Sequence, residues 1–150
     1  MSDQPAIVPA LSYADPNAAV DFLEAAFGFE PGLSVTDSEG RIQHAELTWR
    51  GGRIMLGPAG WAEWAKNPTA VGGANTQCVH VDVTDIDAHC ARARAAGAEI
   101  LAEPADQFYG DRTYRARDPE GHVWNFGQRM REVSAAEMEA ATGLRITTKA

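Results

Sequence analysis

The sequence predicts an α+β protein made of two βαβββ modules, with helices outside curved mixed sheets that surround a cavity. Two observations support this fold class. The order of strand, capped helix and further strands occurs twice, and matching helix signals recur about 70 residues apart. Asp15 and Asp85 suit helix N-caps, and Gly28 and Gly97 suit helix ends. One sheet with one helix would leave a face bare, so the two sheets are expected to pair.

The first module is predicted over about residues 5–57. An apolar strand at 6–13 comes before Asp15, and Pro16 fits the first helical position. Three apolar residues spaced three and four apart predict the buried helix face: Val20, Leu23 and Phe27. Three further strands are expected at about residues 32–36, 41–50 and 53–57.

The second module is predicted over about residues 76–128. Its first strand covers 76–83, its helix ends at Ala96, and the next strand begins at Glu99. A hairpin turns at Asp118–Gly121, where proline suits the second turn position and glycine tolerates a positive φ. Its two arms are expected at about residues 113–117 and 122–126. Two alternating aromatic residues of the second arm are assigned to the core: Trp124 and Phe126.

Two segments fall outside the repeated pattern. The linker at 58–75 is rich in glycine, proline, asparagine and tryptophan, and a short helix is expected at 61–66. The tail at 129–150 extends beyond the second module. Within it, Ser134 and Glu137 have the spacing of a capping box, which predicts a short helix.

Composition restricts the partners. The chain has 150 residues and a formal net charge of −8, which argues against nucleic acid because phosphate binding needs a basic face. No apolar run reaches the length of a membrane span, and the N-terminal segment lacks the features of a signal peptide. Cys78 and Cys90 lie on different predicted elements and are expected to be reduced thiols. We therefore expect a cytoplasmic protein whose partner is a small molecule.

The hairpin around Asp118–Gly121 resembles the one that closes the second module in the vicinal oxygen chelate superfamily. That superfamily includes glyoxalase I, bleomycin resistance proteins and extradiol dioxygenases. The His-Ala-Glu-Leu sequence at His44–Leu47 is similar to that of a bacterial subgroup, the PhnB-like proteins. The resemblance covers about residues 5–128 and implies the glyoxalase/bleomycin resistance fold. It also implies a homodimer, because such relatives often complete each cavity with sheets from two chains.

The resemblance also implies where a metal would be held. The strand positions that carry ligands in metal-dependent members fall at Val8, Met55, Cys78 and Asn125. These side chains form a poor donor set for zinc, iron or manganese. We therefore expect no metal cofactor at these positions.

A second set of polar residues offers an alternative. His44 and Glu46 share one face of a predicted strand, as do His80 and Asp82 on another. Two imidazoles and two carboxylates in one cavity would suit zinc, iron or manganese, or acid–base chemistry. They would equally serve as polar groups of a wet cavity, with the carboxylates paired to arginines.

Aromatic residues near predicted strand ends indicate a cavity mouth. The five are Trp49, Trp61, Trp64, Phe108 and Tyr109. Tryptophans in the linker suggest a lid over an apolar or planar ligand, or alternatively packing on the domain or in a dimer contact. Arg112, Arg115 and Arg117 could bind a carboxylate or phosphate, or form a solvated strand face paired with Asp111 or Asp118.

Three functions remain compatible with the sequence. The first is a metal-free protein that sequesters a planar apolar or cationic compound, with ligand-binding residues His44, Trp49, Trp61, Trp64, His80, Tyr109 and Asn125. The second is a metal-dependent lyase or dioxygenase with a rearranged site at His44, Glu46, His80 and Asp82. The third is a structural or regulatory interaction module. No catalytic residue follows from the sequence.

Overall fold

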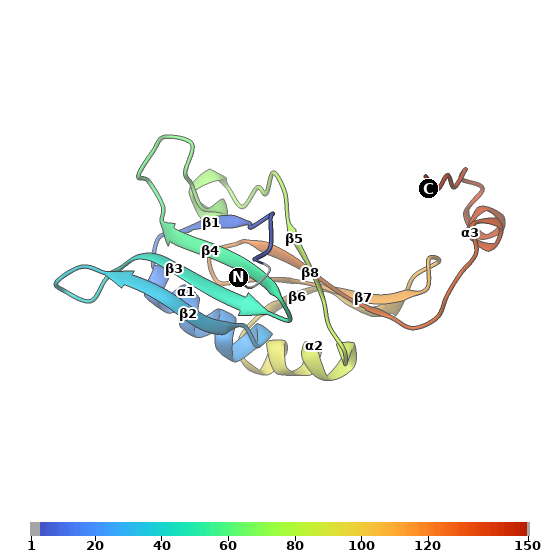
Figure 1. Cartoon of the computed structure of the whole chain (residues 1–150), viewed down its shortest axis with the longest axis horizontal. Helices are drawn as coiled ribbons and strands as arrows, with labels where there is room; N and C mark the ends of the chain where they lie inside the picture. The colour runs from blue at the N-terminus through green and yellow to red at the C-terminus, as the bar shows by residue number, and fades with distance from the viewer. Residues whose placement is uncertain (1–3, 150) are drawn as a thin grey trace.

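The computed structural model describes residues 4–149 and contains two four-stranded mixed sheets, one in each module (Figure 1). The first module contains β1 (Ala10–Tyr13), α1 (Pro16–Phe22), the π-helical turn η1 (Leu23–Phe27), β2 (Glu30–Thr36), β3 (Ile42–Trp49) and β4 (Gly52–Pro58). The second contains β5 (Val79–Asp82), α2 (Ile86–Ala95), β6 (Glu99–Asp106), β7 (Asp111–Arg117) and β8 (Val123–Arg129). The predicted α+β fold class is confirmed.

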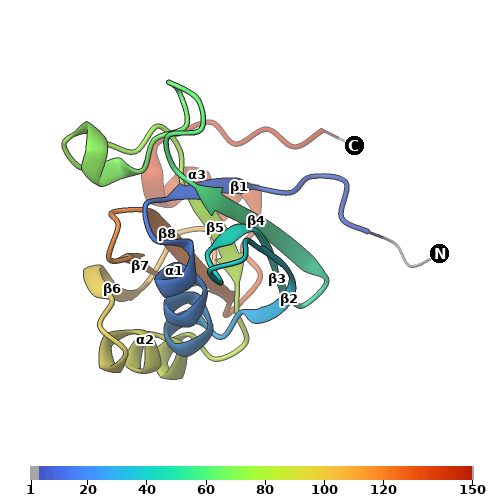
Figure 2. The same ribbon diagram turned by 90° about the vertical axis from the view of Figure 1, so that its left-hand side faces the viewer.

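The two sheets have the same topology. Their strand orders are β1-β4-β3-β2 and β5-β8-β7-β6. In each sheet the first strand pairs in parallel with the last one of its module, and the remaining pairs are antiparallel. Within one chain the sheets stay open on one side and do not close around a cavity (Figure 2).

Both helices begin as the sequence predicts. The Asp15 carboxylate accepts a hydrogen bond from the Ala18 amide at 3.0 Å, and the Asp85 carboxylate accepts one from the Ala88 amide at 3.2 Å. Gly28 ends the first helix with a φ of +81°, a value that glycine adopts without strain. The same kind of cap therefore starts the helix of each module.

The helices lie side by side and share one core (Figure 1). Arg92 of α2 donates hydrogen bonds to the carbonyl oxygens of Glu24 and Ala25, both at 2.8 Å, and thereby satisfies the open end of the first helix. The Phe27 ring packs against Trp124 and Phe126 of the other module, with centroids 5.5 and 4.8 Å apart. The predicted core positions of both aromatic residues are confirmed, since each is fully buried.

Some predicted boundaries differ from the structure. The first strands of the modules begin at Ala10 and Val79, not at residues 6 and 76. The first strand starts late because Pro9, just before Ala10, has no N–H to donate a ladder hydrogen bond. Its carbonyl oxygen accepts a hydrogen bond from the Met55 amide.

The predicted linker helix at 61–66 is wrong. A 3₁₀-helix, η2 (Pro68–Val71), follows this stretch instead, and the Asn67 side chain accepts its Ala70 amide at 3.3 Å. Proline at the first helical position and an asparagine cap favour a helical start at Asn67 rather than at residue 61.

The predicted tail helix is present as α3 (Ala135–Thr142), capped by the Ser134 hydroxyl, which accepts the Glu137 amide at 3.1 Å. It lies at the far end of the second module, away from both other helices (Figure 1). Among residues 4–149 no helix is long and apolar enough to cross a membrane.

Candidate functional site

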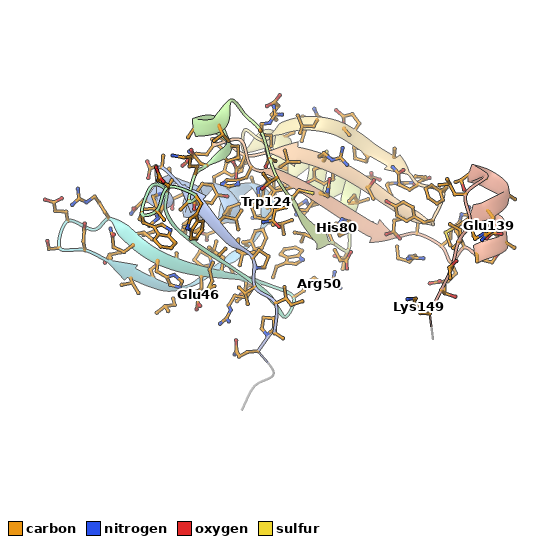
Figure 3. All side chains as sticks on the ribbon, turned by 90° about the horizontal axis from the view of Figure 1, so that it is seen from above. Glu46, Arg50, His80, Trp124, Glu139 and Lys149 are labelled. Atoms are coloured by element: carbon orange, nitrogen blue, oxygen red, sulfur yellow. The ribbon has the colours of Figure 1, made fainter. Side chains whose placement is uncertain are left out.

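Strand alternation leaves polar side chains on the sheet faces that point away from the helices. On β3, Ala45 and Leu47 are buried in the core, whereas His44 and Glu46 keep 39% and 20% of their side-chain surface exposed. On β5, Val81 is buried while His80 is exposed. Figure 3 shows Glu46 and His80 on different sheets. These two open faces are the candidate site.

Equivalent rows of residues cross the two open faces. In module one, Glu46 of β3 pairs with Met55 of β4, which pairs with Ala10 of β1. In module two, Arg115 of β7 pairs with Asn125 of β8, which pairs with His80 of β5. The rows are therefore matched in position, but one carries a carboxylate where the other carries a guanidinium.

The row of module two is linked by hydrogen bonds. Arg115 donates from Nε to the Asn125 side-chain oxygen at 2.6 Å, and the Asn125 amide nitrogen lies 2.9 Å from Cys78 Sγ. Gly127 gives His80 room on the same face, since a Cβ there would lie 3.0 Å from the imidazole carbon Cε1. Asn125 is thereby fixed, with its oxygen toward Arg115 and its nitrogen toward Cys78.

The two predicted histidine–carboxylate pairs form, each within its own sheet. His44 Nε2 lies 3.7 Å from Glu46, and Arg53 Nη1 lies 3.5 Å from the same carboxylate oxygen. His80 Nε2 lies 3.3 Å from Asp82, whose side chain is 84% exposed. The expected arginine partner of Glu46 is present, whereas Asp82 has a histidine partner.

The alternative four-residue metal site is not assembled within one chain. In the described part of the chain, no group of three or more His, Cys, Asp or Glu side chains could hold a common metal ion. The physical reason is topological: His44 and Glu46 belong to one sheet, and His80 and Asp82 belong to the other. Spacing along a strand could not reveal that separation.

The predicted aromatic ligand residues fall in three places. Trp61 and Trp64 form an edge-to-face pair in the linker, with centroids 4.9 Å apart, and are 69% and 76% exposed. Tyr109 lies in the β6–β7 turn against Phe108, at 5.1 Å. Trp49 packs between Phe29 and His89 at the module junction, so the structure does not bring it to the open faces. The five aromatic residues therefore do not line a single mouth.

The arginines of β7 have partners other than the predicted ones. Arg112 pairs with Asp87 and Asp106, and Arg117 pairs with Glu99. The expected partners are engaged elsewhere: Asp111 pairs with Arg129, and the Asp118 carboxylate accepts hydrogen bonds from Tyr13 and Trp124. These pairings depend on which strands are neighbours, which residue spacing did not show.

The hairpin tip between β7 and β8 has a role that the sequence did not reveal. Asp118 accepts the Tyr13 hydroxyl at 2.7 Å and the Trp124 indole nitrogen at 3.2 Å, while Glu120 accepts the backbone amides of Ala14 and Asp15. Burial, followed by the Asp118 charge, raises the pKa of Tyr13 well above its ordinary value of 10.0. The tip thus fixes the end of β1 in the other module.

The opposite tip, between β3 and β4, also contacts the other module, but without a carboxylate. The Trp49 indole nitrogen and Arg50 Nη1 both donate to the backbone oxygen of Asp82, at 2.8 and 3.3 Å. Each hairpin tip therefore contacts the end of the first strand of the other module. Together they set how the two open faces lie relative to each other.

A separate hollow of about 750 Å³ lies beside the N-terminus of α1. Its lining includes Asp15, Asn17, Asp37 and Arg41, and none of the predicted ligand residues. The predicted cavity is thus not this hollow.

The sequence of residues 7–126 matches the family model of the glyoxalase/bleomycin resistance protein/dioxygenase superfamily. The chain belongs to this superfamily. It is 37% identical over 141 residues to the uncharacterized protein Rv0887c of Mycobacterium tuberculosis (strain ATCC 25618 / H37Rv), covering 92% of this chain and 82% of that protein.

Solved structures of the superfamily agree with the fold. TioX from Micromonospora sp. ML1 is 36% identical, with a TM-score of 0.67 over 87% of this chain and 100% of its own. TnmS3, an antibiotic binding protein from Streptomyces sp. CB03234, is 20% identical, with a TM-score of 0.63 over 86% of this chain and 98% of its own. The likeness to TnmS3 shows the fold alone.

The positions that the resemblance assigns to metal ligands are occupied by Val8, Met55, Cys78 and Asn125. Cys78 and Asn125 are neighbours, as their contact at 2.9 Å shows, and Met55 takes the place in module one that Asn125 takes in module two. Val8 and Met55 supply no carboxylate or imidazole, and the Asn125 amide is held by Arg115 and Cys78. These residues do not fit a divalent metal ion.

Proposed function

We propose that the protein binds a small planar molecule against the open faces of its two sheets, without a metal ion. The observation that carries this proposal is the pair of matched rows, which place the half-buried Glu46 and the exposed Arg115 on inner strands of the two open sheet faces. The Arg115–Asn125–Cys78 chain of contacts holds the polar side chains of one face in fixed orientations, which lowers the cost of ordering them when a ligand binds. The fold of TnmS3 is compatible with such a role.

We further propose that a second copy of the chain completes the site. The sheets are open within one chain, and apolar residues on β2 are exposed, with Leu33 at 55% and Val35 at 48%. In a symmetric dimer, module one of one copy would face module two of the other, so that each site holds both kinds of row. Light scattering at micromolar concentration should give a dimer mass. A monomer mass would count against this arrangement.

The ligand is proposed to be planar and apolar or cationic. The exposed Trp61 and Trp64 rings offer stacking surfaces, and Glu46 and Asp82 place carboxylates on the open faces. A cation held over an aromatic ring gains about 0.5–2 kcal/mol. Titration with aromatic cations should shift the tryptophan fluorescence and raise the melting temperature, less so at high salt. If a broad panel changes neither, the binding function loses its support.

Metal content separates this function from the enzyme alternative. Protein purified without chelator should contain no stoichiometric zinc, iron or manganese by elemental analysis. If tightly bound metal is found, the metal content of His44→Ala and His80→Ala variants shows whether these histidines hold it. Release of the metal by these variants would favour a lyase or dioxygenase with ligands drawn from two chains.

A further inference from the structure

Arg115 stands at the centre of the open face of module two. Its strand neighbours Tyr114 and Ala116 are 1% and 0% exposed, so alternation turns Arg115 to the opposite, exposed side. Its strand, β7, is an inner strand of the sheet. The guanidinium is therefore surrounded by sheet on both sides rather than set at an edge.

This guanidinium has no carboxylate partner among residues 4–149. Arg112 and Arg117, on the same strand, each form ion pairs within 3.0 Å. Within the described residues, the Arg115 guanidinium makes a hydrogen bond only to the neutral side chain of Asn125. The chain has 21 acidic residues against 13 Lys and Arg, so the absence of a partner does not reflect a shortage of carboxylates.

The hydrogen bond to Asn125 orients Arg115 and leaves its end unused. It engages Nε at 2.6 Å, while both Nη groups have no partner in the described part of the chain. Asn125 is itself held on its other side by Cys78. A guanidinium fixed in this way presents two parallel N–H donors, which match the two oxygens of a carboxylate.

The neighbouring charges do not compete for this position. Arg117 is neutralised by Glu99 at 3.0 Å, and Asp82 lies on the edge strand β5 beside His80 at 3.3 Å. The equivalent place in module one holds Glu46, which would repel an anion. A ligand with one acidic group would therefore bind in one orientation, with that group toward module two.

We propose that Arg115, backed by Asn125, is the subsite for a carboxylate carried by the planar ligand. This inference rests on the proposed binding function and adds one requirement to its ligand: the planar, apolar or cationic body also carries an acidic group at one end, which lies on Arg115, while the rest of the molecule faces Glu46. The net negative charge of the chain repels an anionic ligand at long range, but salt screens this repulsion. The charge-assisted hydrogen bonds between Arg115 and a carboxylate form at contact and are screened much less.

The test uses three probes of one shape: anthracene-9-carboxylate, its carboxamide and 9-anthracenylmethylammonium. Affinity is measured by fluorescence titration of the wild-type protein and of Arg115→Gln and Arg117→Gln. Arg117 is a matched control, because it lies on the same strand and face but is already paired. The carboxylate should bind more tightly than the carboxamide, and Arg115→Gln should weaken it about tenfold to a hundredfold. Arg117→Gln should change it much less.

A second readout locates the contact. In NMR spectra, the Arg115 Nε–H and Asn125 side-chain signals should shift with the carboxylate and stay unchanged with the ammonium probe. If the carboxamide binds as well as the carboxylate, or both glutamine variants lose equal affinity, the subsite is wrong. Binding of the ammonium probe alone would also overturn it while leaving the proposed function intact. Failure of all three probes would count against both.

Discussion

The two modules share an architecture, but their hairpin tips differ. In module one the tip is a tight turn in which Arg50 and Gly51 have φ values of +44° and +84°. In module two the tip is the longer Asp118–Gly121 turn, which carries a buried carboxylate. Both tips reach the first strand of the other module, yet only the second places carboxylates there, whereas the first contacts it through the Trp49 indole and the Arg50 guanidinium. The shared pattern builds the scaffold, and the differing tips determine how firmly each half is held.

The open faces differ in the same way. Glu46 and Arg115 occupy matched positions with opposite charge. The two modules therefore share their strand order and helix caps, but the sheet faces that a ligand would contact carry different residues.

The largest expected effect follows loss of the Asp118 carboxylate. Asp118→Ala would leave the buried Tyr13 hydroxyl and Trp124 indole nitrogen without an acceptor. Each of the two unsatisfied buried donors costs about 1–3 kcal/mol, so the free energy of unfolding should fall by about 2–6 kcal/mol. Urea denaturation measures this change.

Asp37 in module one provides the control. Its Oδ1 accepts the amides two and four residues ahead, as Asp118 Oδ1 does, but its other oxygen pairs with the exposed Arg41. Asp37→Ala removes the same local bonds without the buried ones. Equal destabilisation by both variants would show that the contact between modules contributes nothing.

The tip of module one should matter less. Trp49→Phe keeps the ring packing against Phe29 but removes the indole donor to the Asp82 carbonyl oxygen. A loss of about 1 kcal/mol is expected in urea denaturation. Trp61→Phe, in the exposed linker, should leave stability unchanged. If Trp49→Phe is as harmful as Asp118→Ala, the proposed asymmetry of the tips is wrong.

The smallest effect concerns pH. His89 of α2 lies between the Tyr114 hydroxyl at 2.5 Å and the Phe27 carbonyl oxygen at 2.8 Å, and Arg92 lies nearby on its own helix. Burial, with a smaller contribution from the Arg92 charge, lowers the pKa of His89 below its ordinary value of 6.5, although the Phe27 bond opposes the shift. The unfolded chain then binds the proton more readily than the folded one.

Stability from neutral His89 should therefore be complete above pH 6.5 and decline as the pH falls from there toward the lowered folded pKa. Urea midpoints between pH 8 and pH 5 measure this slope, which should be smaller in His89→Gln. If the urea midpoint of His89→Gln changes with pH as steeply as that of the wild-type protein, His89 does not cause the loss of stability at low pH.

The sequence predicted what depends on local chemistry. The Asp15 and Asp85 caps, the Gly28 helix end and the buried Trp124 and Phe126 follow from side-chain type and periodicity, and all are present. Assignment of His44 and Glu46 to one strand face also follows from alternation.

The sequence could not show what depends on distant neighbours. The separation of the two histidine–carboxylate pairs, the position of Trp49 at the module junction and the unpaired Arg115 are set by sheet order and register. The linker helix failed because Asn67 and Pro68 start a different helix further along. Residue spacing carries no information on sheet order or register, whereas the Asn67 cap and Pro68 are local signals that the sequence does contain.

In the proposed dimer, each binding site joins module one of one chain to module two of another. Met55→Trp would fill the first face and Asn125→Trp the second, at equivalent positions in the two sheets. Each variant alone should bind none of the anthracene probe that the wild-type protein binds. In a mixed dimer, both blocked faces would fall in one site and both intact faces in the other.

Calorimetric titration of an equal mixture of the two variants, after exchange of subunits, tests this most directly. About half of the dimers should be mixed, each with one intact site, so about a quarter of the wild-type binding capacity should return. No binding beyond that of the separate variants would rule out a site shared between two chains and place any site within a single chain.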